Sequence, residues 1–326
     1  MKINNDGIVY NTIQGISNID KTNTNQNIGE LMVQNSGSTQ TQNNIIGKNA
    51  EVNLEKTPHK STLPGFTEQK IHIKTESGIE FDVSLHTQAS IDREKANQFK
   101  EKICRVISNF PPKVLEDMKA EMKHITLCPN IILNKDALAL GVCEINQIFL
   151  STDKMADLSE KEIEETLIHE QGHLADRLEG TFAGKGSKYM KKSFDALKEV
   201  CTPEFGFEEN SYTLSNTSEF FADYYLYKNG EPSNKHRGKQ FFDLLENYSN
   251  DVNNLTETEL LEKCGEKTLA IKDIVTKWSA IKKELDFYLG NVQSGDYPRA
   301  NEKAKPHTIE QMVEINERIN NKKVAP

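Results

Sequence analysis

The residues best placed to do chemistry in this chain are His169, Glu170 and His173. In the run His169-Glu170-Gln171-Gly172-His173, two imidazoles stand four positions apart with a carboxylate between them. On an α-helix such positions lie about 6 Å apart along the axis and on one side, so both rings can turn toward one ion. This H-E-x-x-H pattern is typical of a Zn²⁺ site with two histidine ligands and a glutamate that handles a proton. The alternative is a core helix with two satisfied histidines.

The residues around this run predict that it is helical. Ser159 followed by Glu162 forms a capping-box pattern, and Gly180 stands where the helix would end. Apolar residues return at helical spacing between these limits, at Ile163, Leu167, Leu174 and Leu178. A second apolar strip predicts burial on more than one side.

A catalytic zinc ion needs a third protein ligand. The spacing that would place a third histidine on the same segment falls on Glu179, so we look to a later helix, expected over residues 216–228. There Glu219 and Asp223 share a face, and two acids on one face repel unless a cation or a donor lies between them. We therefore predict that Glu219 is the third ligand and that Asp223 accepts the distal N–H of His169. The alternative is a solvated acidic face.

The remaining pattern predicts a small sheet before the site helix and mostly helices after it. Apolar residues alternate on both sides of Ser77-Gly78, which indicates a β-hairpin, and a second hairpin is expected from 138–143 with 147–151. Helices are expected over residues 90–109, from Pro111-Pro112 onward, and over 235–248 and 268–289. Strands followed by helices predict an α+β fold.

The composition changes along the chain and suggests three segments. Eleven of the first fifty residues are Asn, and no Phe, Trp or Tyr occurs between Tyr10 and Phe66, so we predict a disordered polar tail over residues 1–65. That tail is either a linker without a role or a delivery signal. Residues 66–293 are expected to form the folded domain, and residues 294–326 a polar segment with a short helical pattern.

Charge and hydropathy exclude several classes of function. The net charge of -9 offers no basic surplus for nucleic acid. No apolar run is long enough to span a membrane, and no apolar signal of the ordinary secretory type occurs near the start. The five cysteines show no paired spacing, which favours reduced thiols.

The run from His169 to His173, Tyr212, and the segment Glu219-Phe220-Phe221-Ala222-Asp223 together resemble the zinc peptidase family that includes the anthrax lethal factor catalytic domain and the Pro-Pro endopeptidases. That family combines H-E-x-G-H, a tyrosine seven residues before the third ligand, and an E-F-F-A-[DE] helix. The resemblance covers about residues 66–289 in order of elements and is specific only at these motifs. It implies a zincin-like fold of the gluzincin type, one catalytic zinc ion and endopeptidase activity.

Carried over by residue, the resemblance makes His169, His173 and Glu219 the zinc ligands, Glu170 the general base and Tyr212 the partner of the oxyanion. The expected substrate is a protein or peptide, with a host protein as one candidate. We do not expect the further domains of lethal factor in a chain of this length, so the resemblance does not carry over its substrate.

We expect a secreted toxin or an injected virulence effector, exported without an ordinary signal peptide, for which type III secretion is one route. Two alternatives stay open at this point. One is a catalytically silent binding module of the same fold, and the other is a cytoplasmic housekeeping peptidase with a disordered tail.

Overall fold

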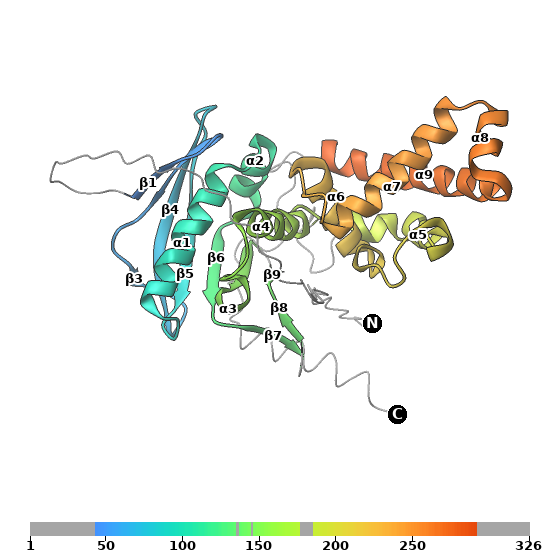
Figure 1. Cartoon of the computed structure of the whole chain (residues 1–326). Helices are drawn as coiled ribbons and strands as arrows, with labels where there is room; N and C mark the ends of the chain where they lie inside the picture. Colours follow the sequence, from blue (N-terminus) through green and yellow to red (C-terminus); the bar gives the residue numbers. More distant parts are fainter. Residues whose placement is uncertain (1–42, 135–136, 145, 177–184, 292–326) are drawn as a thin grey trace, which may run out of the picture.

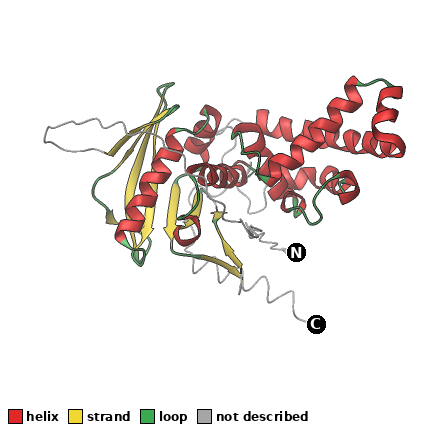
Figure 2. Cartoon of the chain, in the orientation of Figure 1, coloured by secondary structure: helices red, strands yellow, loops and turns green. Residues whose placement is uncertain are grey.

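A computed structural model describes residues 43–134, 137–144, 146–176 and 185–291. The fold is mixed α/β, with a sheet-rich half built from the earlier residues and a helix-rich half built from the later ones (Figures 1 and 2). Across these residues, no helix combines the length and the apolar character that a membrane crossing requires.

The main sheet is mixed. Its strands run in the order β1-β2-β4-β5-β6-β10-β9, and β3 also pairs with β4. Strand β6 is parallel to both of its neighbours, β5 and β10, and the other pairs are antiparallel. The strands are β1 (Asn43–Ile46), β2 (Ala50–Leu54), β3 (His59–Lys60), β4 (Phe66–Thr75), β5 (Glu80–Gln88), β6 (His124–Cys128), β9 (Gly141–Glu144) and β10 (Gln147–Ser151). A separate small sheet pairs β7 (Ile131–Asn134) with β8 (Ala137–Ala139).

The first predicted hairpin is confirmed, and the second is confirmed in part, because residues 138–139 of its first expected strand pair with β7 instead. Strands β4 and β5 pair across a turn in which Gly78 has a φ of 81°, a conformation that favours glycine. Strands β9 and β10 form the second hairpin, immediately before the site helix. Strand β9 is the last on the described path of the sheet, whereas β10 lies inside it. Among the described residues, β9 is therefore the edge strand at this end of the sheet.

The N-terminal segment joins the sheet earlier than its composition predicts. We expected disorder up to residue 65, but β1 pairs with β2, and β2 pairs with β4. Ala50 and Val52 are buried in the core on the helix-covered face. The prediction is wrong for residues 43–65, because the Asn-rich average concealed the two-residue alternation of Ala50, Val52 and Leu54. Residues 1–42 and 294–326 lie outside the described residues.

Helices from both sides of β6 in the sequence share the core on one face of the sheet. Helix α1 (Arg93–Ser108) begins at Asp92, whose side chain accepts from two backbone N–H groups, and α2 (Pro112–Glu121) begins with proline at its first turn, as predicted. After the short α3 (Thr152–Met155), the site helix α4 (Glu160–Ala175) packs against α1, α2 and strand β9. Its predicted capping box, Ser159 with Glu162, is confirmed. The helix ends at Ala175, and Gly180 lies outside the described residues.

The second half packs around an aromatic core. Trp278, Tyr224, Phe220 and Phe242 are buried there, with ring centroids 5.3 to 5.9 Å apart in the pairs that touch. Its helices are α5 (Lys185–Val200), α6 (Thr217–Asn229), α7 (Arg237–Asn254), α8 (Glu257–Cys264) and α9 (Thr268–Asn291). Three 3-10 turns connect them, at Pro203–Phe205, Tyr212–Leu214 and Gly265–Lys267.

Helix α6 joins the two halves. Tyr225 and Leu226 belong to the core beneath the sheet, whereas Phe220, Phe221 and Tyr224 belong to the aromatic core. In Figure 1, α4 lies between the sheet and the helices to its right, with α6 beside it. A residue on the α4 side of α6 is therefore held by packing from both halves.

Candidate metal centre

Helix α4 places His169 and His173 one turn apart with their rings facing one region. The ring centroids are 4.8 Å apart and the rings are nearly perpendicular, at 87°. Both side chains are buried. Because the capping box fixes where α4 begins and its apolar residues fix which face meets the sheet, the direction of both imidazoles follows from the sequence of this one helix.

Helix α6 brings Glu219 to the same point. Its Oε2 lies 3.1 Å from Nε2 of His169 and 3.3 Å from Nε2 of His173. One ligand atom from each of these three residues lies within 4.8 Å of the others, and all three residues are buried. In a tetrahedral shell with bonds of about 2.1 Å, ligand atoms lie about 3.4 Å apart. The His169, His173 and Glu219 group has donor types and spacings that suit a metal ion.

The close approach of α4 and α6 depends on Gly172. A Cβ atom at this position would lie 2.9 Å from Cα of Ala222 and 3.0 Å from Cβ of Tyr225. Distances below 3.0 Å do not occur for real side chains, so the two helix backbones approach this closely only with glycine here. The glycine inside the histidine motif is thus what lets Glu219 reach the histidines.

Asp223 lies where the sequence places it, against His169. Its Oδ1 is 2.9 Å from Nδ1 of His169, and its Oδ2 accepts a hydrogen bond of 2.7 Å from Oγ1 of Thr213. The carboxylate therefore holds the imidazole with Nδ1 protonated and Nε2 turned toward Glu219. This is the hydrogen bond that was predicted from the shared face of Glu219 and Asp223.

The buried charges stabilise one another. Burial alone would lower the pKa of His169, but hydrogen bonds to Asp223 and Glu219 outweigh it and hold the pKa well above its usual value. Burial likewise raises the pKa of Glu219, yet the two histidines bring it far below its usual range. A positive charge between the two imidazoles and the Glu219 carboxylate is therefore stabilised, and either a proton or a metal ion can supply it.

Glu170 lies against the edge strand β9, and its negative charge is one of the smaller causes of the raised pKa of Tyr212. Glu170 is fully buried, and a Cβ atom at Gly141 would lie 3.2 Å from both Cγ and Oε1 of Glu170. The Glu170 carboxylate therefore lies against the bare backbone of β9. It is not part of the group of possible metal ligands found among the described residues.

Tyr212 also reaches the centre. It begins a 3-10 turn that leads into α6, where the sequence predicted a loop, and its ring centroid is 6.3 Å from that of His169. Burial raises the pKa of Tyr212 well above its usual value, and the negative charge of Glu219 and a hydrogen bond to it act in the same direction. The phenol consequently keeps its proton and is able to donate it in a hydrogen bond.

Sequence reasoning missed four residues around the centre. Asp176 and Ser218 lie beside His173, Thr213 supports Asp223, and Gly141 makes room for Glu170. Asp176 stands three residues after His173, a spacing that puts both on one helix face, so the sequence held a usable signal for it. The other three depend on how separate segments cross.

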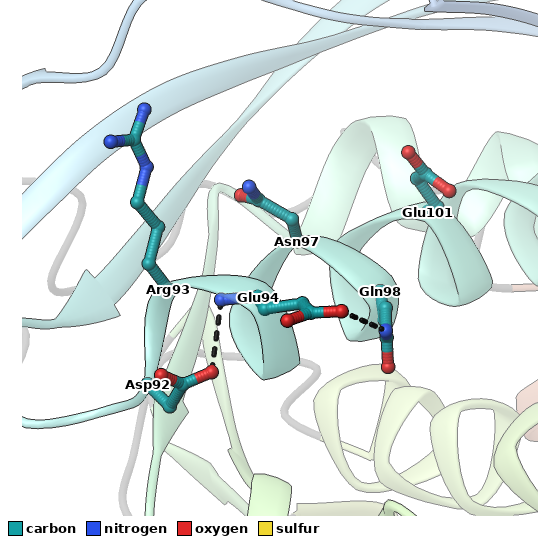
Figure 3. Close-up of a pocket in the computed structure, with 6 residues that line it drawn as sticks. All are labelled: Asp92, Arg93, Glu94, Asn97, Gln98 and Glu101. Atoms are coloured by element: carbon teal, nitrogen blue, oxygen red, sulfur yellow. Dashed lines mark hydrogen bonds between the residues drawn. The ribbon is translucent and has the colours of Figure 1, made fainter.

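A hollow of about 410 Å³ lies elsewhere, over the first turns of α1 (Figure 3). It is lined by Asp92, Arg93, Glu94, Asn97, Gln98 and Glu101, all of which are exposed. Figure 3 shows that Asp92 and Gln98 make hydrogen bonds within the helix itself. The hollow shares no residue with the metal centre and gathers no group of ligands.

Comparison of the chain with models of known protein families, with curated proteins and with solved structures finds no match.

Proposed function

We propose that this chain is a zinc-dependent endopeptidase with a zincin-like fold, which hydrolyses peptide bonds of a protein substrate. The single observation that carries the proposal is the convergence of His169, His173 and Glu219 from two helices on one buried point. Glu170 follows His169 directly on the site helix, as the sequence pattern of zinc peptidases requires.

The donor set favours zinc over harder cations. Two imidazole nitrogens and one carboxylate oxygen are ligands that zinc accepts in catalytic sites, which use three protein ligands. Calcium and magnesium prefer shells made of oxygen atoms. When bound, zinc would supply Lewis acidity, which polarises a carbonyl group and makes water acidic enough to react at neutral pH.

The chain's own residues would divide the remaining work. Glu170 would take the proton from the attacking water and pass it to the leaving amine, as a general base and then a general acid. Tyr212, which keeps its proton, would donate a hydrogen bond to the oxygen that becomes negative in the transition state. Asp223 would hold His169 in the tautomer that leaves Nε2 free for the ion.

Replacing the proposed base tests this function. We expect Glu170→Gln to bind zinc as the wild type does but to cleave peptides at least about 10²-fold more slowly, because an amide cannot accept the water proton. The measurement is incubation of both full-length proteins with a diverse peptide library, with cut sites identified by mass spectrometry. Glu164→Gln, a half-buried carboxylate on the same helix, is the matched control and should cleave normally. Normal cleavage by Glu170→Gln would refute the assignment.

The role as a delivered effector is a separate proposal with its own test. The polar segment expected to carry a delivery signal includes residues 1–42, which lie outside the described residues. We expect those residues, fused to a reporter, to direct its export from a bacterium with a type III system. Retention of the fusion in the cell would favour the housekeeping alternative.

A further inference from the structure

Ser218 and Asp176 form a second buried polar group beside the metal centre. Oγ of Ser218 lies 3.2 Å from Nδ1 of His173 and 3.4 Å from Oδ2 of Asp176. His173, Ser218 and Asp176 are each at most 2% exposed. Ser218 directly precedes Glu219 on α6, and Asp176 is the C-cap residue that follows the last residue of α4. The contact therefore joins the last turn of α4 to the first turn of α6.

The position of Ser218 is fixed by its own helix. The side chain of Asn216 accepts hydrogen bonds from the backbone N–H of Ser218, at 2.9 Å, and from that of Glu219, at 3.0 Å. One cap thus orders both the hydroxyl that meets His173 and the carboxylate that meets the two histidines. The cap fixes the backbone that carries the Ser218 hydroxyl, and the contacts with His173 and Asp176 select its side-chain direction.

The direction of each hydrogen bond follows from what the groups are able to donate. An ionised carboxylate only accepts, so the hydroxyl hydrogen of Ser218 is directed to Asp176. The Oγ atom then has only lone pairs to offer His173, and Nδ1 of His173 must carry the hydrogen. In the neutral ring, Nε2 of His173 then keeps the lone pair that an ion would use, and this atom lies 3.3 Å from Oε2 of Glu219.

We propose that Ser218 and Asp176 are positioning residues that hold His173 in the tautomer and orientation needed to bind the metal ion, an inference that rests on the proposed metal site. The two histidines are then oriented in parallel ways. His169 donates directly to the carboxylate of Asp223, and His173 donates to a hydroxyl that a carboxylate orients. Helix α6 supplies one metal ligand and contributes an orienting group for each histidine.

The test is the zinc affinity of the full chain, measured by competition with a chromophoric chelator. We expect Ser218→Ala to weaken zinc binding by about 10- to 100-fold, the loss usual when a partner of a ligating histidine is removed. Asp176→Asn should weaken binding in the same direction, because an amide can donate to Oγ and so remove the constraint on the hydroxyl. Ser215→Ala removes an exposed hydroxyl three residues away and should leave the affinity unchanged.

Two further readouts separate positioning from a general loss of structure. The unfolding midpoint of the metal-free variants should stay close to that of the metal-free wild type. The visible spectrum of the cobalt-loaded protein should change in Ser218→Ala but not in Ser215→Ala, because it reports the geometry around the ion. Wild-type zinc affinity together with an unchanged cobalt spectrum in Ser218→Ala would overturn the inference. If Ser218→Ala does not fold, wild-type affinity and an unchanged spectrum in Asp176→Asn would overturn it.

Failure of this inference is distinguishable from failure of the proposed function. A wild type that binds zinc and cleaves peptides, with variants that bind zinc equally well, removes only the roles of Ser218 and Asp176. A wild type that binds no zinc removes the proposed function and this inference together.

Discussion

Glu170 has a neighbour that its sequence motif does not name. The carboxylate lies against Gly141 of the edge strand, and only the missing side chain of Gly141 leaves it room. A general base must be held within a few tenths of an ångström of its working position, because a misplacement of about 1 Å costs on the order of 10²-fold in rate. The rate is therefore expected to depend on a strand residue that has no functional group.

We predict that Gly141→Ala lowers the rate of peptide cleavage by roughly tenfold while zinc remains bound, because the new Cβ would lie 3.2 Å from Oε1 of Glu170 and displace it. Steady-state kinetics and zinc content are the measurements. Val142→Ala is the control, since Val142 packs into a different cluster on the same strand and its loss should act on stability alone. Cleavage at the wild-type rate by Gly141→Ala would show that Glu170 is not constrained by β9.

The candidate ligands could be chosen from the sequence, but the groups that orient them largely could not. His169, His173, Glu219 and Asp223 are marked by spacing along single helices, and the structure brings all four together. Tyr212 was placed by the resemblance alone, and it lies near His169. Ser218, Thr213 and Gly141 take their roles from contacts between separate elements, and helix periodicity carries no information about such contacts.

At the scale of elements, the site is the crossing of α4 and α6. The crossing is close because Gly172 presents no side chain to Ala222 and Tyr225. Glycine in a helix interior costs about 1 kcal/mol relative to alanine, so its presence here opposes the local preference for helix. The gain is the short distance between the histidines on one helix and Glu219 on the other.

Gly172→Ala should therefore destabilise the protein by about 1–3 kcal/mol despite its better helix propensity, because the two helices must separate. Zinc binding should weaken as well, since Glu219 would move away with α6. Denaturant unfolding and a zinc titration provide the two measurements. Thr166→Ala, at a half-buried position of the same helix, should change neither property greatly. A stabilised Gly172→Ala variant with full zinc affinity would contradict the role given to this crossing.

A different element-scale feature is the pair of histidines on the sheet face away from α4. Nε2 of His86 on β5 lies 3.0 Å from Nδ1 of His124 on β6, and Nδ1 of His86 lies 2.8 Å from Oγ of Ser61. Burial lowers the pKa of His86 to about 4, the charge of His124 adds to this, and Glu68 opposes it. In the unfolded chain the same imidazole takes up its proton near its ordinary pKa of about 6.5.

The sign of the resulting pH dependence follows from which state binds more protons. As the pH falls from about 6.5 to about 4, the unfolded state binds a proton at His86 that the folded state does not, so stability is lost across this window. Between pH 7 and pH 5, the metal-free wild type should lose about 2 kcal/mol more than His86→Gln. Equal pH dependence in the wild type and His86→Gln would show that His86 does not titrate in this way.

The sequence predicted the regular elements better than it predicted their limits. The capping box of α4, the prolines that begin α2 and the glycine turn between β4 and β5 are local signals, and each was confirmed. Strands β1 and β2 were missed because the Asn-rich average concealed the short alternation of β2. Their stability also comes from pairing, β1 with β2 and β2 with β4, and the composition of residues 43–54 does not show such pairing.

For the whole molecule, the metal centre lies where the two halves share one helix. One face of α6 belongs to the core beneath the sheet and another to the aromatic core, and Glu219 lies on α6 beside α4. An ion bound by His169, His173 and Glu219 would link the site helix to the helix that joins the halves. Because such an ion binds the folded chain and not the unfolded one, it would also stabilise the fold.

The measurement that tests this account most directly is the zinc content of the purified full chain after exhaustive dialysis, compared with that of Glu219→Ala. The account predicts about one zinc ion per wild-type chain and close to none in Glu219→Ala, because removal of one of three protein ligands opens the shell. A wild type without zinc, or a variant that holds as much zinc as the wild type, would contradict it.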